Sequence, residues 1–160
     1  RLIRRQRQMC IRDRPLFSYE MVGICSKDHP LANKEVWQAE DFAEETWVTY
    51  PVPDDMLDLY RQVLKPKGIN PPRRTTELTI ALIQLVASRR GIATVPYWAA
   101  LPYLEKGYVV ARKITEEGLY SNLYAAIRKE DANLAYIEDF HQTVKAQSFS
   151  TLPGLSVLEL

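Results

Sequence analysis

The sequence predicts an α/β fold in which helices flank a mixed, partly parallel sheet. Segments rich in β-forming residues alternate along the chain with segments of helical periodicity, an order typical of such folds. The clearest signal is an apolar helix over residues 79–90 that is stopped by Gly91, followed by a short buried strand over residues 92–95 that is ended by Pro96. The 160 residues, 46% of them hydrophobic, suffice for one domain, or for one lobe plus part of another.

The first half of the chain is expected to hold strands and short helices in alternation. β-forming residues predict a strand over residues 17–25, and a second strand is expected over residues 46–50. A short acidic helix over residues 38–44 is expected between them. A polar strand is expected over residues 73–78.

Residues 54–65 are expected to form a regular helix. Asp54 or Asp55 can cap its N-terminus, where a carboxylate also suits the helix dipole. Its apolar residues share one face at helical spacing: Met56, Leu57, Tyr60, Val63 and Leu64. The helix over residues 79–90 is apolar around most of its girth, so we expect a sheet or a partner subunit to bury it.

The second half continues the alternation. A helix is expected over residues 99–106, strands over residues 108–114 and 119–128, and a last helix capped by Asn133. One face of that helix carries Ile137, Phe140, His141 and Val144. The residues after Ser148 lack periodicity and are expected to be loose.

Charge is distributed unevenly. Residues 1–14 carry six Arg and one Asp, whereas the remainder carries 15 basic and 19 acidic residues, so the folded part is mildly acidic. This balance argues against a nucleic-acid-binding surface on it. Because Met9 to Arg14 reads like a translated sequencing adaptor, the arm is expected to be non-native and outside the fold. The alternative is a basic arm that binds nucleic acid.

No catalytic or metal-binding motif stands out. The sequence has no Walker loop, no G-x-G-x-x-G and no G-x-S-x-G. Its two histidines, His29 and His141, are expected to be structural, and Cys10 and Cys25 make neither a disulfide framework nor a metal set. Cys25 is expected to be a buried free thiol. We therefore expect no enzyme activity and no cofactor.

Two joins between a strand and a helix offer binding chemistry. One lies at residues 49–54 and the other at residues 77–79. In α/β sheets, ligands bind outside the carboxyl ends of strands, and free N–H groups at a helix start accept anions. Asp54 and Asp55 compete for those donors. The alternative interpretation of both joins is ordinary loop and cap chemistry.

The helix–Gly–strand–Pro run resembles the effector-binding domains of LysR-type transcriptional regulators, in the branch that activates methionine-biosynthesis genes. The resemblance covers roughly residues 15–150. The stretches that carry it are residues 49–52, 57–58, 64–66, 82–84, 91–93, 96–98 and 118–128.

The resemblance implies a fold like type 2 periplasmic binding proteins, with two lobes joined by crossing strands. Residues 15–23 would be a crossing strand and residues 24–114 the second lobe. Residues 115–150 would give the return strand and C-terminal helix of the first lobe, and residues 151–160 a flexible tail. The DNA-binding domain and most of the first lobe would lie before residue 15.

The resemblance also implies homocysteine as the effector. The effector-binding residues carried over are Thr49, Tyr50, Pro51, Val52, Glu77, Thr79, Pro96 and Tyr97. A cleft for such a ligand needs hydrogen bonds for a carboxylate and an ammonium, plus an apolar spot for the thiol end. Thr49 would serve the carboxylate and Glu77 the ammonium, while Val52 and Tyr97 would pack on the sulfur end.

The expected function is therefore ligand sensing by a cytoplasmic transcriptional activator that forms a homo-oligomer. DNA would be contacted only through the absent N-terminal domain, and no membrane contact is expected because no run of 18 apolar residues exists. A solute-binding protein fragment of a transport system is the main alternative. A small α/β enzyme is a third, for which the catalytic residues are not found.

Overall fold

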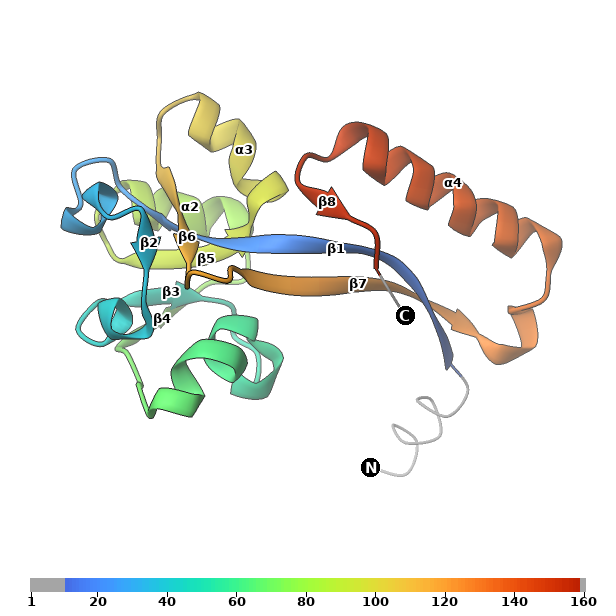
Figure 1. The fold of residues 1–160 in the computed structure, drawn as a ribbon, viewed down its shortest axis with the longest axis horizontal. Helices are drawn as coiled ribbons and strands as arrows, with labels where there is room; N and C mark the ends of the chain where they lie inside the picture. Colours follow the sequence, from blue (N-terminus) through green and yellow to red (C-terminus); the bar gives the residue numbers. More distant parts are fainter. Residues whose placement is uncertain (1–10, 159–160) are drawn as a thin grey trace. The chain divides into compact units, whose positions relative to one another are not determined.

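The computed structural model describes residues 11–158, and the chain divides into two compact units. Unit 2 spans Glu20–Ser121, and unit 1 consists of the chain up to Tyr19 and from Asn122 onward. Two long strands, β1 (Ile11–Cys25) and β7 (Leu119–Arg128), each contribute to both units and pair with each other (Figure 1).

Unit 2 is built on a sheet with the strand order β2-β6-β1-β5-β3-β4. Its further strands are β2 (Val36–Trp37), β3 (Trp47–Thr49), β4 (Arg73–Thr75), β5 (Ile92–Pro96) and β6 (Val110–Ile114). β3 runs parallel to both β4 and β5, and β2 runs parallel to β6, whereas β1 is antiparallel to β5 and β6. The prediction of a mixed, partly parallel sheet is confirmed.

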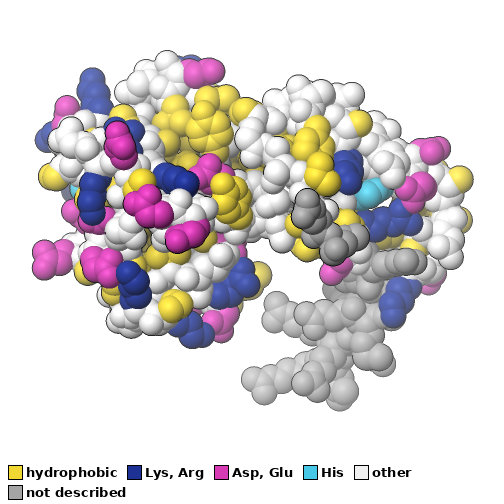
Figure 2. Space-filling model, in the orientation of Figure 1, with side chains coloured by type: hydrophobic (Ala, Val, Ile, Leu, Met, Phe, Trp, Pro, Cys, Tyr) yellow, Lys and Arg dark blue, Asp and Glu magenta, His cyan; other side chains and the backbone are white. Residues whose placement is uncertain are grey.

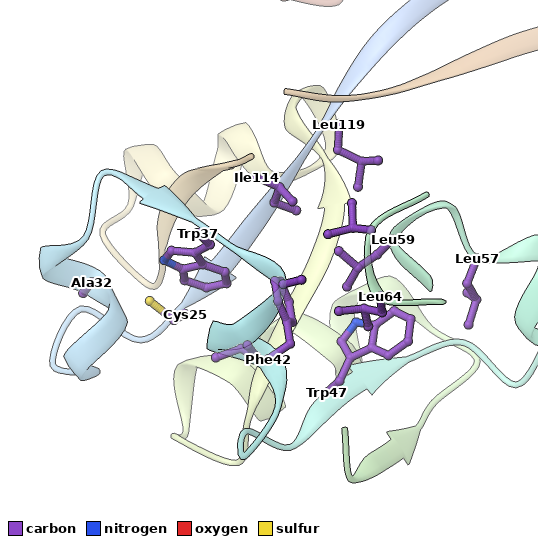
Figure 3. Packing of buried hydrophobic residues seen from close by; sticks show 13 residues of the cluster. Cys25, Ala32, Trp37, Phe42, Trp47, Leu57, Leu59, Leu64, Ile114 and Leu119 are labelled. Carbon is purple, nitrogen blue, oxygen red and sulfur yellow. The ribbon is translucent and has the colours of Figure 1, made fainter. Parts of the chain in front are cut away.

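Alternate residues of the central strands point to opposite faces of the sheet and pack into two different cores. Trp47 and Ile92 belong to an aromatic core that also contains Trp37, Phe42, Leu59 and Leu64 (Figure 3). Their neighbours Val48 and Ala93 belong instead to a second core, with Leu82, Ile83 and Val86. Since the strands are buried on both faces, their sequences read as continuous apolar runs.

Helices α2 (Thr79–Ala87) and α3 (Tyr97–Glu105) supply the second core. α2 buries Leu82, Ile83 and Val86 and contacts β3 and β5, which confirms that the sheet covers one side of this helix. α3 begins two residues earlier than expected, because Pro96 holds the extended backbone of an N-cap and the helix starts directly after it.

The prediction of a regular helix over residues 54–65 is wrong. The segment forms a 3-10 turn η3 (Asp54–Met56), a π-helical stretch η4 (Tyr60–Leu64) and a second 3-10 turn η5 (Lys65–Lys67). Pro66 has no N–H to donate, which accounts for the end of the helical segment at η5. Pro53 is the N-cap of η3 and makes no side-chain cap, and Met56 is exposed.

Two more short helices border the sheet of unit 2. η1 (Pro30–Asn33) is followed by η2 (Ala39–Phe42), which is the expected acidic helix in 3-10 form. Gln38 and Asp41 form a capping box at its start.

Unit 1 contains the outer parts of β1 and β7 together with η6 (Lys129–Asp131), α4 (Ala135–Thr151) and β8 (Leu155–Ser156). The cap expected at Asn133 is wrong: Leu134 is the N-cap of α4 and makes no side-chain cap.

The residues after Ser148, in which no periodicity is read from the sequence, form regular structure in part. The last helix continues to Thr151, and β8 pairs antiparallel with β1 at Ser18 and Tyr19. Pairing of the backbone with β1 therefore gives this segment regular structure. The segment is too short for its side-chain periodicity to be recognised in the sequence.

The expected boundary of the N-terminal arm at residue 14 differs from the structure. β1 begins at Ile11, and Arg14 forms an ion pair with Glu138. The Arg14 guanidinium also donates to the carbonyl oxygen of Ala132 at 2.6 Å. A basic side chain thus joins unit 1 through a carboxylate on α4, while residues 1–10 of the arm lie outside the described residues.

The surface carries charges of both signs. On the face drawn in Figure 2, basic and acidic side chains of the described residues are interspersed, as the near-zero net charge suggests. No helix between residues 11 and 158 is both long and apolar enough to cross a membrane.

Candidate functional site

A pocket of about 120 Å³ lies in unit 2, where β3 and β5 end. Its lining residues come from β1, β3, β5 and the irregular segment after β3: Met21, Trp47, Thr49, Tyr50, Met56, Leu57, Asp58, Leu59 and Thr94. This is the carboxyl edge of two parallel neighbours, the place where open α/β sheets bind ligands. The pocket is therefore the candidate effector site.

The pleat of the strands explains why two threonines meet there. Thr49 follows Trp47 by two residues and Thr94 follows Ile92 by two, and Trp47 is paired with Ile92 in the parallel register. Both threonines consequently lie on the face of the aromatic core, just beyond its last large side chains. At this edge of the sheet, the hydroxyl groups of the two threonines follow the apolar side chains of the core.

The structure brings three of the eight expected effector residues together. Thr49 and Tyr50 line the pocket, and the Tyr50 hydroxyl lies 2.8 Å from the hydroxyl oxygen of Thr79. The carbonyl oxygen of Thr49 accepts a hydrogen bond from the backbone N–H of Thr76 at 3.0 Å. Thr49 is 4% exposed, so its backbone and side chain are held in place by the sheet.

The other five expected residues do not line this pocket. Pro51, Val52 and Glu77 have exposed side chains in the loops that follow β3 and β4. Pro96 and Tyr97 are half-buried where β5 passes into α3.

Sequence reasoning missed the contributions of β1, of the segment after Met56 and of Thr94. A signal for Thr94 is present in the sequence, since each of the two buried strands carries a threonine two residues after a large buried side chain, Trp47 or Ile92. Using it requires knowing that β3 and β5 are neighbours.

Asp58 is the charged residue among those that line the pocket. One carboxylate oxygen accepts hydrogen bonds from the Arg61 guanidinium and from Nε2 of Gln62, the latter at 3.2 Å. The other accepts from the Ser121 hydroxyl at 2.8 Å. The side chain of Asp58 is 19% exposed, whereas that of Arg61 is 56% exposed.

Elsewhere, the potentially reactive side chains of Cys25, His29 and His141 have structural roles. Burial raises the pKa of the Cys25 thiol from 9.0 to about 11, although Arg112 acts in the opposite direction. A thiol with so high a pKa is poorly nucleophilic at neutral pH. His29 faces Glu45 at 3.3 Å and caps η1, and the Nε2 of His141 lies 3.1 Å from a backbone carbonyl oxygen.

A larger pocket, of about 290 Å³, lies in unit 1. It is formed by β1, β7 and α4, and most of its lining side chains are apolar: Leu16, Ala125, Ala126, Ile127, Arg128, Asp131, Ile137, Phe140, His141 and Val144. It contains none of the expected effector residues. Among the described residues, no group of three His, Cys, Asp or Glu side chains could hold a metal ion.

Comparison with known proteins identifies the family. The LysR substrate binding domain matches residues 3–148. The chain is 84% identical over 147 residues to the HTH-type transcriptional regulator MetR of Haemophilus influenzae, covering 92% of this chain and 48% of that protein. It thus spans about half the length of this curated relative.

Solved structures agree with this match. The regulatory domain of a MetR from N. meningitidis, a LysR family regulator, superposes with a TM-score of 0.88 at 65% identity, covering 94% of this chain and 69% of that one. The effector-binding domain of QuiR in complex with shikimate, at 21% identity and a TM-score of 0.72, shares the fold and covers 88% of this chain and 68% of its own.

The fold is therefore the periplasmic-binding-protein-like fold of LysR regulatory domains. The sequence match, the superposition and the pocket at the carboxyl ends of β3 and β5 lead to one conclusion: the chain belongs to the LysR substrate-binding domain family, the effector-binding part of LysR-type transcriptional regulators.

Proposed function

We propose that this chain senses homocysteine within a regulator that activates methionine-biosynthesis genes. The observation that carries the proposal is the pocket lined by Thr49 and Thr94, in a domain 84% identical to a MetR regulator. Hydroxyl groups at the carboxyl ends of parallel strands are placed to orient a small polar ligand.

The lining suits a small amino acid with a sulfur end. Thr49 and Thr94 offer hydroxyls that both donate and accept hydrogen bonds. Met21, Met56 and Leu57 offer soft apolar surface for a thiol and its methylene groups. Polar groups that fix orientation and an apolar wall that receives the side chain are the usual composition of small-molecule sites.

Trp47 carries an unsatisfied donor beside the pocket. Its indole Nε1 is buried and has no hydrogen-bond partner within the described part of the chain. Buried polar groups normally have a partner, but this atom has almost no accessible surface, so a ligand carboxylate would reach it only after a shift of the indole. The eight expected residues remain part of the proposal, with Thr49, Tyr50 and Thr79 as its centre and Pro51, Val52, Glu77, Pro96 and Tyr97 around it.

In the whole regulator, DNA would be bound by a domain outside this chain, and the protein would act as a homo-oligomer. Leu78 and Ile80 at the start of α2 are exposed apolar side chains that suit contact with a second subunit. The regulator would act in the cytoplasm, where an unpaired Cys25 stays reduced. The alternative of a transport-associated solute-binding protein is less well supported, because the curated relative is a regulator.

The test is calorimetry with homocysteine on a full-length regulator that contains this chain. Thr49→Ala should weaken binding about tenfold or more, since it removes a hydrogen bond to a charged ligand group. Thr75→Ala is the matched control, because Thr75 pairs with Thr49 in the sheet but is exposed and does not line the pocket. If the wild-type protein takes up no homocysteine, the effector is wrong. If it does and Thr49→Ala binds equally well, the site is wrong.

A further inference from the structure

We infer that Asp58 is the residue that recognises the ammonium group of the effector, and that the pocket thereby selects for an amine. This inference rests on the proposed function and assigns a role at the same site. The family resemblance suggested Glu77 for this role, but Glu77 is exposed and does not line the pocket.

The charge of the lining supports an amine. Asp58 carries the charged side chain among the lining residues, and the others are apolar, aromatic or hydroxyl-bearing. A carboxylate in a mostly apolar wall favours a cation and disfavours an anion beside it. Arg61 offsets this preference only in part, because it contacts one of the two carboxylate oxygens and its side chain is 56% exposed.

The carboxylate of Asp58 is fixed in orientation and has room for another donor. It accepts from Arg61 and Gln62 at Oδ1 and from Ser121 at Oδ2. A carboxylate has about four acceptor sites on its two oxygens, so Oδ2 can take a second hydrogen bond. An ammonium group carries three donors, and a charge-assisted bond to an already oriented carboxylate is one of the stronger contacts available.

The neighbouring hydroxyls would complete the selection. Thr49 and Thr94 can accept from the same ammonium or donate to the ligand carboxylate, whereas Met21 and Met56 cannot replace a charged partner. The pocket should therefore distinguish homocysteine from 4-mercaptobutanoate, which has the same thiol, chain and carboxylate but no amine. Selectivity of this kind arises because a buried polar group is left unpaired by the wrong ligand.

The experiment measures the Kd of both compounds by calorimetry on the full-length regulator. Wild type should bind homocysteine on the order of ten- to a hundredfold more tightly than 4-mercaptobutanoate. Asp58→Asn has almost the same shape and should remove most of that ratio by weakening homocysteine alone. Asp55→Asn, the same chemical change at an exposed acid of the same segment that does not line the pocket, is the matched control and should leave the ratio unchanged. Glu77→Gln is measured beside it, because the family resemblance gives Glu77 the same role.

The outcomes separate the two proposals. If wild type binds both compounds equally, or if Asp58→Asn keeps the wild-type ratio, the role of Asp58 is overturned while homocysteine sensing stands. A loss of the ratio in Glu77→Gln alone would return the role to Glu77. If wild type binds neither compound, the effector assignment fails and this inference fails with it. The wild-type comparison needs no variant, so it holds even where Asp58→Asn does not fold.

Discussion

At the scale of single residues, the join between α2 and β5 shows how closely the backbone packs around the site. Gly91 has a φ of +146°, and a Cβ placed on it would lie 2.2 Å from the carbonyl oxygen of Thr46. The backbone N–H of the next residue, Ile92, donates to that same oxygen at 2.9 Å. Only glycine allows this approach, which sets β5 beside β3 and thereby places Thr94 near Thr49.

Cys25 gives the domain a predictable response to alkaline pH. Its folded-state pKa is raised by burial to about 11, above the ordinary value of 9.0. The folded state therefore holds the thiol proton more tightly than the unfolded state, and this contribution is complete below about pH 9. It should be lost as pH rises from 9 towards 11, lowering the free energy of unfolding by about 2 kcal/mol at pH 10.5.

The measurement is urea unfolding at pH 8 and pH 10.5. Tyrosines and lysines also titrate in this range, so the informative quantity is the difference between wild type and Cys25→Ala. The variant should lose about 2 kcal/mol less than wild type between the two pH values. Equal losses in both proteins would contradict the assignment of this effect to Cys25.

At the scale of elements, α2 illustrates how one helix divides its apolar residues between two environments. Leu82, Ile83 and Val86 are fully buried against the sheet, whereas Ile80 is 56% exposed. The helix is thus a wall of the core on one side and an uncovered apolar surface on the other. This is consistent with the sequence, which has more apolar residues than one face requires.

We predict that Leu82→Ala destabilises the chain by roughly 2–5 kcal/mol, because it leaves a cavity in a packed core. Ile80→Ala is the control on the same helix and should change the free energy of unfolding by less than about 1 kcal/mol. Chemical denaturation of both variants tests this. Similar losses for the two would mean that the exposed side of α2 is covered in solution.

The irregular segment between β3 and β4 is the element that completes the pocket. It contributes Met56, Leu57, Asp58 and Leu59, and it carries two of the partners that hold the Asp58 carboxylate, Arg61 and Gln62. Despite the 3-10 and π turns, Leu57, Val63 and Leu64 still pack in one core, whereas Met56 is exposed. Arg73 of β4 supports the segment by lying over the rings of Trp47 and Tyr60, at 5.2 and 4.9 Å from their centroids.

At the scale of the whole molecule, the two units differ in how well their apolar surfaces are covered. Unit 2 has two buried cores, whereas unit 1 has a mostly apolar pocket along α4 where Phe140 is 67% exposed. The chain covers 69% of the matching regulatory domain from N. meningitidis. Within the described residues, unit 1 therefore leaves more apolar surface uncovered along α4 than unit 2 leaves at its cores.

We predict that the 160-residue chain binds homocysteine at least about tenfold more weakly than a full-length regulator that contains it. A ligand gains affinity when most of its surface is enclosed, and each lost polar contact costs about a factor of ten. Calorimetry on both proteins under one set of conditions provides the comparison. Equal affinity would show that the pocket of unit 2 is a complete site by itself.

The sequence by itself determined the order of most strands and helices and the buried character of the centre. These follow from local patterns: β7 was predicted with its observed bounds, and Gly91 and Pro96 mark the ends of their elements because their backbone restrictions are intrinsic. The family resemblance could likewise be read from short stretches of residues, and it is confirmed.

Only the tertiary structure decided which residues share the pocket. Thr49 and Thr94 lie 45 positions apart in the chain, and they meet because β3 and β5 are paired in parallel, which no local pattern reveals. Asp58 lies between the 3-10 turn η3 and the π-helical stretch η4, and its place in the lining depends on how this segment packs beside β3 and β5. Strand pairing and helix irregularity depend on contacts between distant segments, so periodicity and propensity alone could not place these residues.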